Sequence, residues 1–310
     1  MTRLDGVLEH LAEADVVAGE LRALRESRPE DLATAVNLES VLRRRGDLEH
    51  ELRALLSWQQ LELVTYRVEQ FDGSDAPAAA VASSILTFQA LITSAFDALR
   101  AGPKRTYQPS SENQRLSALQ FGRAPGAREA IQLTIPNERL LGVETVLDMA
   151  LDLVFELFAA RGKVLIRNLA ARVGIATVTA ARAWAENAVQ HGLTTAITWH
   201  RPSDKPRTVA FSHSEALLFR TAIDAVADDT VQPRREECEL VSIDESARTF
   251  RLVLANGTMV AGDLTDSFPP GGHWTTRRWY VADLLRADRI RYGSGAEDVR
   301  WSLRGLSPIE

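Results

Sequence analysis

The chain has 310 residues, of which 45% are hydrophobic and 25% are charged, and its formal net charge is −6. These fractions are typical of soluble globular proteins, so they exclude disordered, collagen-like and low-complexity classes. A chain of this length usually folds as two or three domains, because single cores stop growing at about 250–300 residues. The acidic balance argues against a protein whose whole surface binds nucleic acid.

Cysteine usage and the N-terminal segment predict a cytoplasmic protein, and the excess of arginine over lysine suggests a bacterial origin. The single cysteine, Cys238, cannot form a disulfide within the chain, and no cysteine cluster is present to hold zinc or an iron–sulfur centre. Residues 1–10 are charged from Arg3 onward and lack the apolar core of a signal peptide. No apolar run reaches the roughly 18 residues that span a bilayer. All but three of the 36 basic residues are arginine, which is typical of GC-rich bacterial genomes. We expect no bound cofactor.

The first hundred residues show helical periodicity throughout. The expected helices cover residues 4–26, 31–69 and 78–100. Gly46 is expected to interrupt the second of them, because glycine inside a helix costs about 1 kcal/mol relative to alanine. The pattern predicts an all-α helical domain over residues 1–101. Its long apolar stripes need a covering surface, which is either the domain's own interior or a second copy of the chain.

A stretch rich in glycine, proline and polar residues at 102–113 predicts a domain boundary. After it, residues 130–135 alternate apolar and polar side chains, which predicts a half-buried strand that pairs with residues 116–121. Helices are then expected at 142–160, 163–173, 177–191 and 214–227, and strands at 194–200 and 208–212. This mixture predicts a central α+β domain over residues 114–230.

The last part of the chain consists of short strands. They are expected at residues 239–243, 249–254, 258–264, 277–284, 288–292 and 299–303. Asn256-Gly257 is a strong hairpin signal, because both positions tolerate positive φ. We therefore predict a small antiparallel β-barrel, SH3-like or OB-like, over residues 236–310. The whole chain is accordingly expected to be an α+β multidomain protein.

No catalytic motif is visible in the sequence. It contains no nucleophile elbow, no P-loop and no glycine fingerprint of a dinucleotide site, and its six histidines lack the spacing of a zinc helix. Ser212 and Glu215 flank His213, but this spacing is typical of a helix capping box. We therefore assign no catalytic and no metal-binding residue. An enzyme would need a site assembled from distant residues, such as His200 or His213 beside a carboxylate.

Residues 163–192 have the residue order of a helix-turn-helix, with an apolar–Gly–apolar turn around Gly174 and small residues on the second helix. Residues 161–207 hold eight basic and two acidic residues in a chain that is acidic overall. A nucleic-acid surface there would use Arg167, Arg172, Thr177, Thr179 and Arg182. The competing interpretation is core packing, because the second helix carries Trp184 and leads into an apolar strand.

A second candidate surface lies in the segment His273–Tyr280, where aromatic residues lie beside two arginines. Such a surface on a small barrel stacks bases or binds a proline-rich or acidic peptide. The residues that would contact the partner are Trp274, Arg277, Arg278 and Tyr280. The competing interpretation is a barrel strand that buries Trp279 while Tyr280 and the arginines face outward.

These observations favour a non-catalytic binding or assembly protein of a bacterial regulatory or anti-phage defence module. Its acidic helices would mediate oligomerisation or partner docking, and its small β-barrel would recognise a protein partner. The first alternative is a nucleic-acid-binding regulator that uses the basic segment 161–207. The second alternative is an enzyme whose site is not visible in the sequence.

Overall fold

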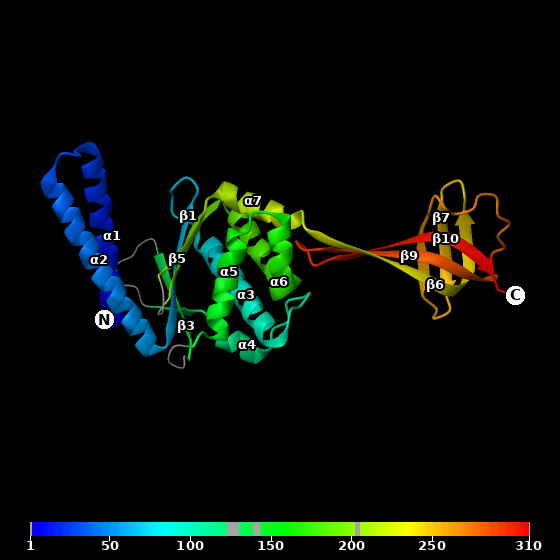
Figure 1. Ribbon diagram of the computed structural model, residues 1–310, viewed down its shortest axis with the longest axis horizontal. Coiled ribbons are helices and arrows are strands. Elements are labelled where there is room, and N and C mark those ends of the chain that lie inside the picture. The colour runs from blue at the N-terminus through cyan, green and yellow to red at the C-terminus, as the bar shows by residue number, and fades with distance from the viewer. Residues whose placement is uncertain (1, 123–129, 139–142, 202–204, 310) are drawn as a thin grey trace. The chain divides into compact units, whose positions relative to one another are not determined.

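The computed structural model describes residues 2–122, 130–138, 143–201 and 205–309. Over these residues the protein is a mixed α/β structure with seven helices and two five-stranded sheets, which confirms the expected class at this level. The chain divides into two compact units, Met1–Ile223 (unit 1) and Asp224–Glu310 (unit 2) (Figure 1).

Unit 1 begins with a helical hairpin of α1 (Arg3–Ser27) and α2 (Leu32–Gln59). Each helix starts at a side chain that accepts a backbone N–H hydrogen bond, Thr2 for α1 and Asp31 for α2. α2 runs unbroken through Gly46, so the expected interruption is wrong. Packing against α1 outweighs the small helical cost of one glycine. The side chains buried in the hairpin include Leu4, Val7, Leu11, Ala14, Ala18, Leu38, Leu48 and Leu52.

Residues 61–69 form a strand, so the helix predicted there is wrong. Gln60 adopts a left-handed conformation with φ of 53°, which ends α2. The next ten residues are β1 (Leu61–Gln70), the central strand of a sheet with the order β2-β3-β1-β4-β5. β1 is rich in β-branched and aromatic residues, which fit a pleated surface between two neighbouring strands. The pairing with those neighbours therefore decided a segment whose apolar spacing fitted either structure.

The sheet of unit 1 is antiparallel throughout. Its other strands are β2 (Gln120–Phe121), β3 (Ala130–Pro136), β4 (Leu193–His200) and β5 (Arg207–Phe211). The partner predicted for β3 is confirmed only at residues 120 and 121, because Ser111–Leu116 forms a short helix, α4. The remaining helices are α3 (Ala78–Ala101), α5 (Val146–Ala159), α6 (Lys163–Gln190) and α7 (His213–Asp224). In Figure 1 the sheet lies between the hairpin and these helices.

Aromatic side chains fill the space between the sheet and the helices. Tyr66 of β1 is fully buried, and its hydroxyl accepts a hydrogen bond from Trp184 Nε1 of α6 at 2.7 Å. The same hydroxyl lies 2.7 Å from Ser84 Oγ of α3. The rings of Phe158 and Trp184 lie 4.7 Å apart between their centroids. One tyrosine thus connects β1, α3 and α6 across an apolar core.

α6 contains the two helices predicted at 163–173 and 177–191, separated by a break at Gly174. Gly174 has φ of 80° and ψ of 159°, which glycine adopts without strain. A Cβ atom there would lie 2.4 Å from the backbone N and O of Lys104. The Lys104 carbonyl also accepts a hydrogen bond from the N–H of Ala176 at 3.0 Å. The segment after α3 therefore crosses α6 at its break.

The predicted boundary at 102–113 does not separate two domains. Lys104 in this segment packs against α6, and α3 packs along α6 as well. β1 also pairs with β3 and β4 from the supposed second domain. Sheet pairing of this kind joins residues 1–101 and 114–223 into one unit, which a sequence reading of the linker composition could not detect.

Unit 2 is a five-stranded sheet. Its strands are β6 (Ala227–Asp244), β7 (Thr249–Leu254), β8 (Met259–Leu264), β9 (Trp279–Arg291) and β10 (Glu297–Pro308). The strand order is β10-β8-β7-β6-β9, and β9 also pairs with β10, so the pairing returns to its first strand. The prediction of an antiparallel sheet is wrong for one pair, because β10 runs parallel to β8 while the other neighbours are antiparallel. The strands predicted at 277–284 and 288–292 are one continuous strand, and β6 begins twelve residues earlier than expected. The expected hairpin at Asn256-Gly257 is confirmed, with φ of 81° at Gly257.

Two helices, α3 and α6, have the length and apolar composition of a membrane span. Half or more of the most apolar window of each helix is buried inside unit 1. α6 is also broken at Gly174, so it is not one straight helix. Apolar helices that form a protein core pass the same test of composition, and this arrangement is compatible with a soluble protein.

We predict opposite effects for two glycine-to-alanine substitutions. Gly174→Ala should lower the free energy of unfolding by roughly 2–4 kcal/mol, because it combines positive φ with a clash against Lys104. Gly46→Ala, where a Cβ meets no atom within 4 Å, should raise it by about 0.5–1 kcal/mol. Urea denaturation followed by circular dichroism measures both. Equal effects of the two substitutions would contradict the packing described at the break.

Candidate functional site

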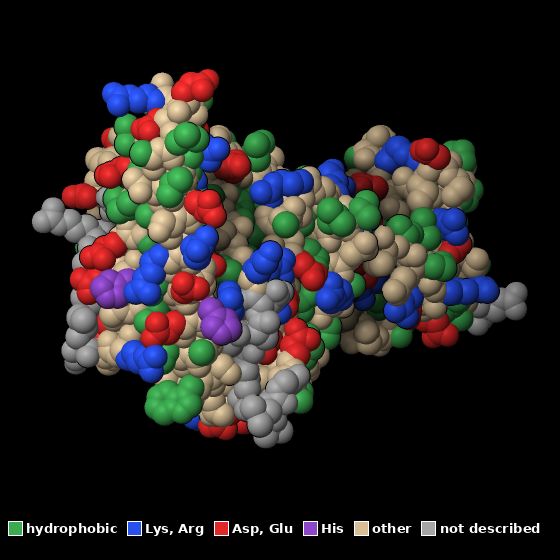
Figure 2. Space-filling view, turned by 60° about the vertical axis from the view of Figure 1, so that its left-hand side comes forward, with side chains coloured by type: hydrophobic (Ala, Val, Ile, Leu, Met, Phe, Trp, Pro, Cys, Tyr) green, Lys and Arg blue, Asp and Glu red, His purple; other side chains and the backbone are tan. Residues whose placement is uncertain are grey.

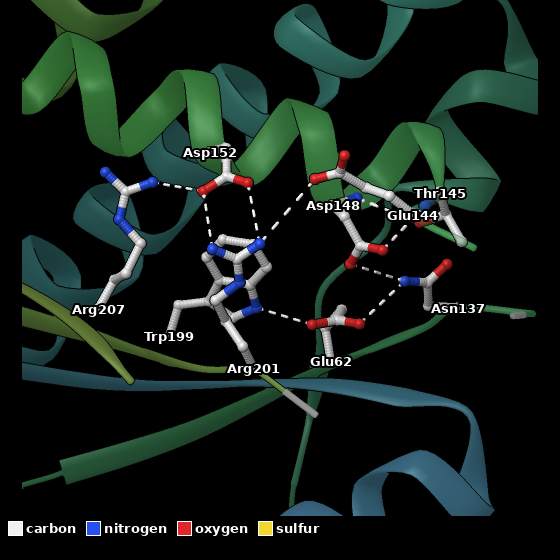
Figure 3. Close-up of polar contacts among 9 residues, drawn as sticks. All are labelled: Glu62, Asn137, Glu144, Thr145, Asp148, Asp152, Trp199, Arg201 and Arg207. Carbon is white, nitrogen blue, oxygen red and sulfur yellow. Dashed lines mark hydrogen bonds and ion pairs between the residues drawn. The ribbon is translucent and has the colours of Figure 1, made fainter. Parts of the chain in front are cut away.

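A cluster of polar and charged side chains lies where the sheet of unit 1 meets α5 (Figure 3). Glu62 of β1 is fully buried, and its two oxygens accept hydrogen bonds from Trp199 Nε1 at 2.7 Å and from Asn137 Nδ2 at 2.9 Å. The same Asn137 amide lies 3.3 Å from Asp148 Oδ1, so it donates toward two carboxylates. Asp148 also caps α5 together with Thr145. One amide thus bridges the sheet and the start of α5.

Asp152, one helical turn after Asp148, binds two arginines from the sheet. Arg201 lies 3.1 Å and 3.3 Å from its two oxygens, and Arg207 also donates to it. The Arg201 guanidinium carbon lies 4.6 Å from the ring centroid of Trp199. The two guanidinium groups occupy both oxygens of this carboxylate and neutralise its charge. Asp152, Arg201 and Arg207 therefore form a structural network whose charges neutralise one another.

The histidines considered for an assembled catalytic site have different surroundings. His200 Nε2 lies 2.9 Å from Thr65 Oγ1, and that hydroxyl donates to Gln132, so His200 is the donor to Thr65. Burial lowers the pKa of His200 from 6.5 to about 4; the charge of Asp15 opposes this shift and that of Arg45 adds to it. A histidine that is neutral near pH 7 and hydrogen-bonded to a hydroxyl lacks the carboxylate of a catalytic pair.

Ser212, His213 and Glu215 form a helix cap. The Glu215 N–H donates to Ser212 Oγ at 3.3 Å, and the Ser212 N–H donates to Glu215 Oε2 at 2.8 Å. This confirms the capping box. The His213 ring lies 6.0 Å from that of Phe71, and its Nδ1 has no hydrogen-bond partner among the residues that the structure describes.

Thiol and metal chemistry find little support in the described ranges. Within them, no three His, Cys, Asp or Glu side chains gather as metal ligands would. Cys238 is buried in the core of unit 2, and burial raises the pKa of its thiol to about 11. The thiolate is the reactive form of cysteine, so this pKa disfavours nucleophilic attack.

The structure corrects the proposed nucleic-acid surface at Thr177. This residue is 1% exposed, and its hydroxyl donates to the Val173 carbonyl at 2.7 Å and lies 3.0 Å from Ser94 Oγ of α3. Asn187 on the same helix is buried as well and donates to Ser83 Oγ of α3 at 2.8 Å. α3 therefore occupies a face of the helix that would have to enter a DNA groove.

Two of the three arginines of that candidate surface lie close to acidic side chains of unit 1. Arg172 lies 2.8 Å from Glu156, and Arg182 lies 3.6 Å from Glu186. Arg167 is exposed and Thr179 is half-buried on the two halves of α6. The five residues share α6, but Thr177 is not on a surface with the others.

In unit 2 the candidate partner surface has a different residue set. Tyr280 is 5% exposed, and its hydroxyl donates to the Thr275 carbonyl at 3.2 Å, so its assignment to the surface is wrong. Trp279, which we expected inside, is 47% exposed. Strand β9 alternates in the opposite phase because Tyr280 shares the core face with Ala282 and Leu284.

Trp274 belongs to the rim of the same core. Its ring centroid lies 5.6 Å from that of Phe268 and 6.0 Å from that of Tyr280. Its Nε1 is buried and has no hydrogen-bond partner within the described part of the chain. Trp274 is therefore half-buried packing, and Arg277 and Arg278 remain exposed with Trp279. We call Arg277, Arg278 and Trp279 the Arg–Trp patch.

Comparison with known proteins gave no family model, no curated protein and no solved structure that matches this chain. The residues and their geometry therefore carry the functional argument.

Two sets of residues were missed in the sequence. Trp279 was assigned to the interior because two adjacent aromatic residues leave the phase of a strand open. Glu62, Asn137 and Asp148 were missed because they are far apart in the chain. The available signal was Glu62 itself, a single charge inside the apolar run 61–64.

Replacing Trp199 by phenylalanine tests the Glu62 cluster. Trp199→Phe removes one donor to a fully buried carboxylate, so the free energy of unfolding should fall by about 2–3 kcal/mol. The control is Trp58→Phe, because Trp58 is 81% exposed and its replacement should change stability by less than about 0.5 kcal/mol. Urea denaturation compares the two; equal stabilities would show that the Trp199–Glu62 hydrogen bond contributes nothing.

The His200 site makes stability depend on pH. The folded pKa of about 4 lies below the unfolded value of 6.5, so the unfolded chain binds more protons and stability falls as the pH drops from 6.5 to 4. His200→Gln keeps a hydrogen-bond donor for Thr65 but cannot be protonated. The urea midpoint should therefore fall less for this variant than for the wild type between pH 7 and pH 5. Parallel pH profiles would contradict the lowered pKa.

Proposed function

We propose that the protein is a non-catalytic binding and assembly protein of a bacterial regulatory or defence module. In this proposal unit 2 recognises a protein partner through the Arg–Trp patch, and the acidic helices of unit 1 mediate association. We also propose that unit 2 is a small barrel of the SH3-like or OB-like type, supported by five strands whose pairing returns to its start. The cytoplasm is the proposed compartment, as the sequence predicts.

The observation that carries the proposal is the exposure of two adjacent arginines beside a half-exposed tryptophan. Arg277 and Arg278 have no ion-pair partner among the residues described in unit 2. Elsewhere in the unit, arginines do find carboxylates, as Arg291 does with Asp298 at 2.6 Å. Tryptophan and arginine are the residues most enriched in the energetic centres of protein interfaces.

The backbone holds the patch in place. The N–H of Arg277 donates to the Leu240 carbonyl at 2.7 Å, and the Leu240 N–H donates to the Arg278 carbonyl at 3.0 Å. The Trp279 carbonyl accepts a hydrogen bond from Ile309, whose side chain is 42% exposed. A surface whose backbone is already fixed loses little entropy when it binds.

The chemistry of the patch specifies the partner. Two unpaired guanidinium groups favour carboxylates, and the Trp279 and Ile309 side chains favour an apolar residue next to them. We therefore propose an acidic protein segment that carries an apolar or aromatic side chain. The basic segment 161–207 supports a nucleic-acid role less well, because α3 covers Thr177 and Asn187.

The test is a random peptide library displayed on phage and selected on the full-length protein. The selected peptides should be rich in Asp and Glu next to an aromatic or aliphatic residue. Arg277→Ala/Arg278→Ala/Trp279→Ala should weaken their binding at least about tenfold, because it removes the charges and the apolar anchor together. Fluorescence polarisation with a labelled selected peptide measures the affinity.

The matched control is Arg251→Ala/Met259→Ala, which removes an exposed arginine and an exposed apolar side chain elsewhere in unit 2. This variant should bind the peptides like the wild type. Equal binding by the patch variant would overturn the proposal. So would tight, salt-sensitive binding of mixed-sequence DNA or RNA that the same three substitutions abolish.

A further inference from the structure

The hairpin of α1 and α2 has a hollow of about 280 Å³ on one side, lined by Glu13, Val17, Ser40 and Arg44 among others. Toward the loop that joins the helices, Leu24 follows Val17 by seven residues and Val36 precedes Ser40 by four, so helical spacing places them on the same side. Leu24 is 46% exposed and Val36 is 64% exposed. We call this side the outer face of the hairpin. Figure 2 brings this end of unit 1 forward and shows hydrophobic side chains among charged ones.

The opposite side of the hairpin faces the sheet, and it carries a group of charges that pair within the chain. Arg45 lies 2.6 Å from Asp15 and 3.0 Å from Glu49. Asp15 and Arg45 are also close enough to His200 of β4 to act on its pKa. The outer face therefore points away from the sheet.

We propose that the outer face binds the same face of a second copy of the chain. The two hairpins would form an antiparallel four-helix bundle about a two-fold axis parallel to the helices. This inference rests on the association role proposed for the acidic helices, and it specifies the surface, the occupant and the register.

The register follows from the hairpin itself. The Asp15–Arg45 and Arg3–Glu51 contacts show, to within about one helical turn, which residues lie level on the two helices. The two helices are antiparallel, so a step of nine residues toward the loop leads from Asp15 to Leu24 on α1 and from Arg45 to Val36 on α2. Leu24 and Val36 therefore lie at about the same height. Rotation about a two-fold axis parallel to the helices does not shift residues along the helix axis. Residues that lie at one height in the first copy therefore lie at the same height in the second, and α1 of each copy packs against α2 of the other. In the proposed dimer Leu24 therefore lies within about one helical turn of Val36 of the second copy, and both exposed apolar side chains become buried.

The charges of the outer face complement each other in the same register. Glu20 follows Glu13 by seven residues, and together they flank the level of Arg44 on the facing α2. Arg44 and Glu20 have no ion-pair partner among the described residues, and Glu13 contacts only the exposed His10, at 3.2 Å. Glu13 and Glu20 of each copy thus lie near Arg44 of the other copy, and the two-fold axis produces this arrangement twice in the dimer.

The outer face is large enough for a stable dimer. α1 has 25 residues and is therefore about 38 Å long, and two adjacent helices each about 10 Å wide give a face of about 750 Å². Standard protein interfaces bury about 800 Å² per partner. The apolar residues toward the loop supply the binding energy, and the charges set the register, because exposed ion pairs contribute little alone.

Charge reversal tests the register with the full-length protein in analytical ultracentrifugation. The wild type should be a dimer at micromolar concentration. Arg44→Glu places glutamates opposite Glu13 and Glu20, and Glu13→Arg/Glu20→Arg places arginines opposite Arg44. Each variant alone should dissociate at least about tenfold more readily. An equimolar mixture of the two should restore the dimer, because every facing pair is then attractive.

The matched control is Arg22→Glu, which makes the same charge change on α1 seven residues after Asp15, on the side away from the outer face. It should dimerise like the wild type. A monomeric wild type overturns the inference. A dimer whose stability neither charge reversal changes also overturns it, because the copies would then associate through another surface. Failure of the mixture to re-form the dimer also overturns it. Peptide binding by unit 2, measured on the same samples, reports separately on the Arg–Trp patch.

Discussion

The buried carboxylate of Glu62 is the constraint on which the architecture of unit 1 depends. A carboxyl group that is removed from water must be hydrogen-bonded, and here the donors come from other elements. Trp199 from β4 and Asn137 after β3 supply the donors, and Asn137 extends the connection to Asp148 of α5. The strand on either side of β1 and the helix above it are thereby held in one arrangement. This is why a strand of ten residues can follow directly on a long helix and still define the centre of a sheet.

Local signals in the sequence predicted most elements, and tertiary contacts decided the rest. The strands and helices from 130 to 224 and the Asn256-Gly257 hairpin follow from periodicity, caps and turn residues, each of which acts within a few positions. Residues 61–69 were assigned to a helix because their apolar spacing suits the period of a helix as well as that of a strand. Only the pairing with β3 and β4 distinguishes the two structures. The phase of Trp279 and Tyr280 was open for a similar reason. Thr177 looks like a surface residue until α3, eighty residues away in sequence, is placed against it.

The charged residues of the protein fall into two groups with different roles. In unit 1, Asp152, Arg201 and Arg207 neutralise one another in a partly buried cluster, where removal of one partner would leave an uncompensated charge. At the Arg–Trp patch and on the outer face of the hairpin, charges lie exposed beside apolar side chains. Exposed charges add little to folding stability, which is consistent with the proposal that those beside Trp279 and Leu24 serve association. Paired charges thus mark the structural network, and unpaired charges beside exposed apolar groups mark the proposed surfaces.

Unit 2 has a second feature that bears on how a partner binds. Within the part of the chain that the structure describes, residues 229–236 of β6 pair with β9 alone, so this part of the strand has a free edge. A free edge is the usual site for strand addition by a peptide, but Pro233 lacks an N–H there, and the charged run 234–237 follows it. Both features oppose the addition of another strand. Under the proposed function, recognition by side chains is therefore the mode left to unit 2, and the Arg–Trp patch, whose own backbone is already hydrogen-bonded to Leu240, fits that mode.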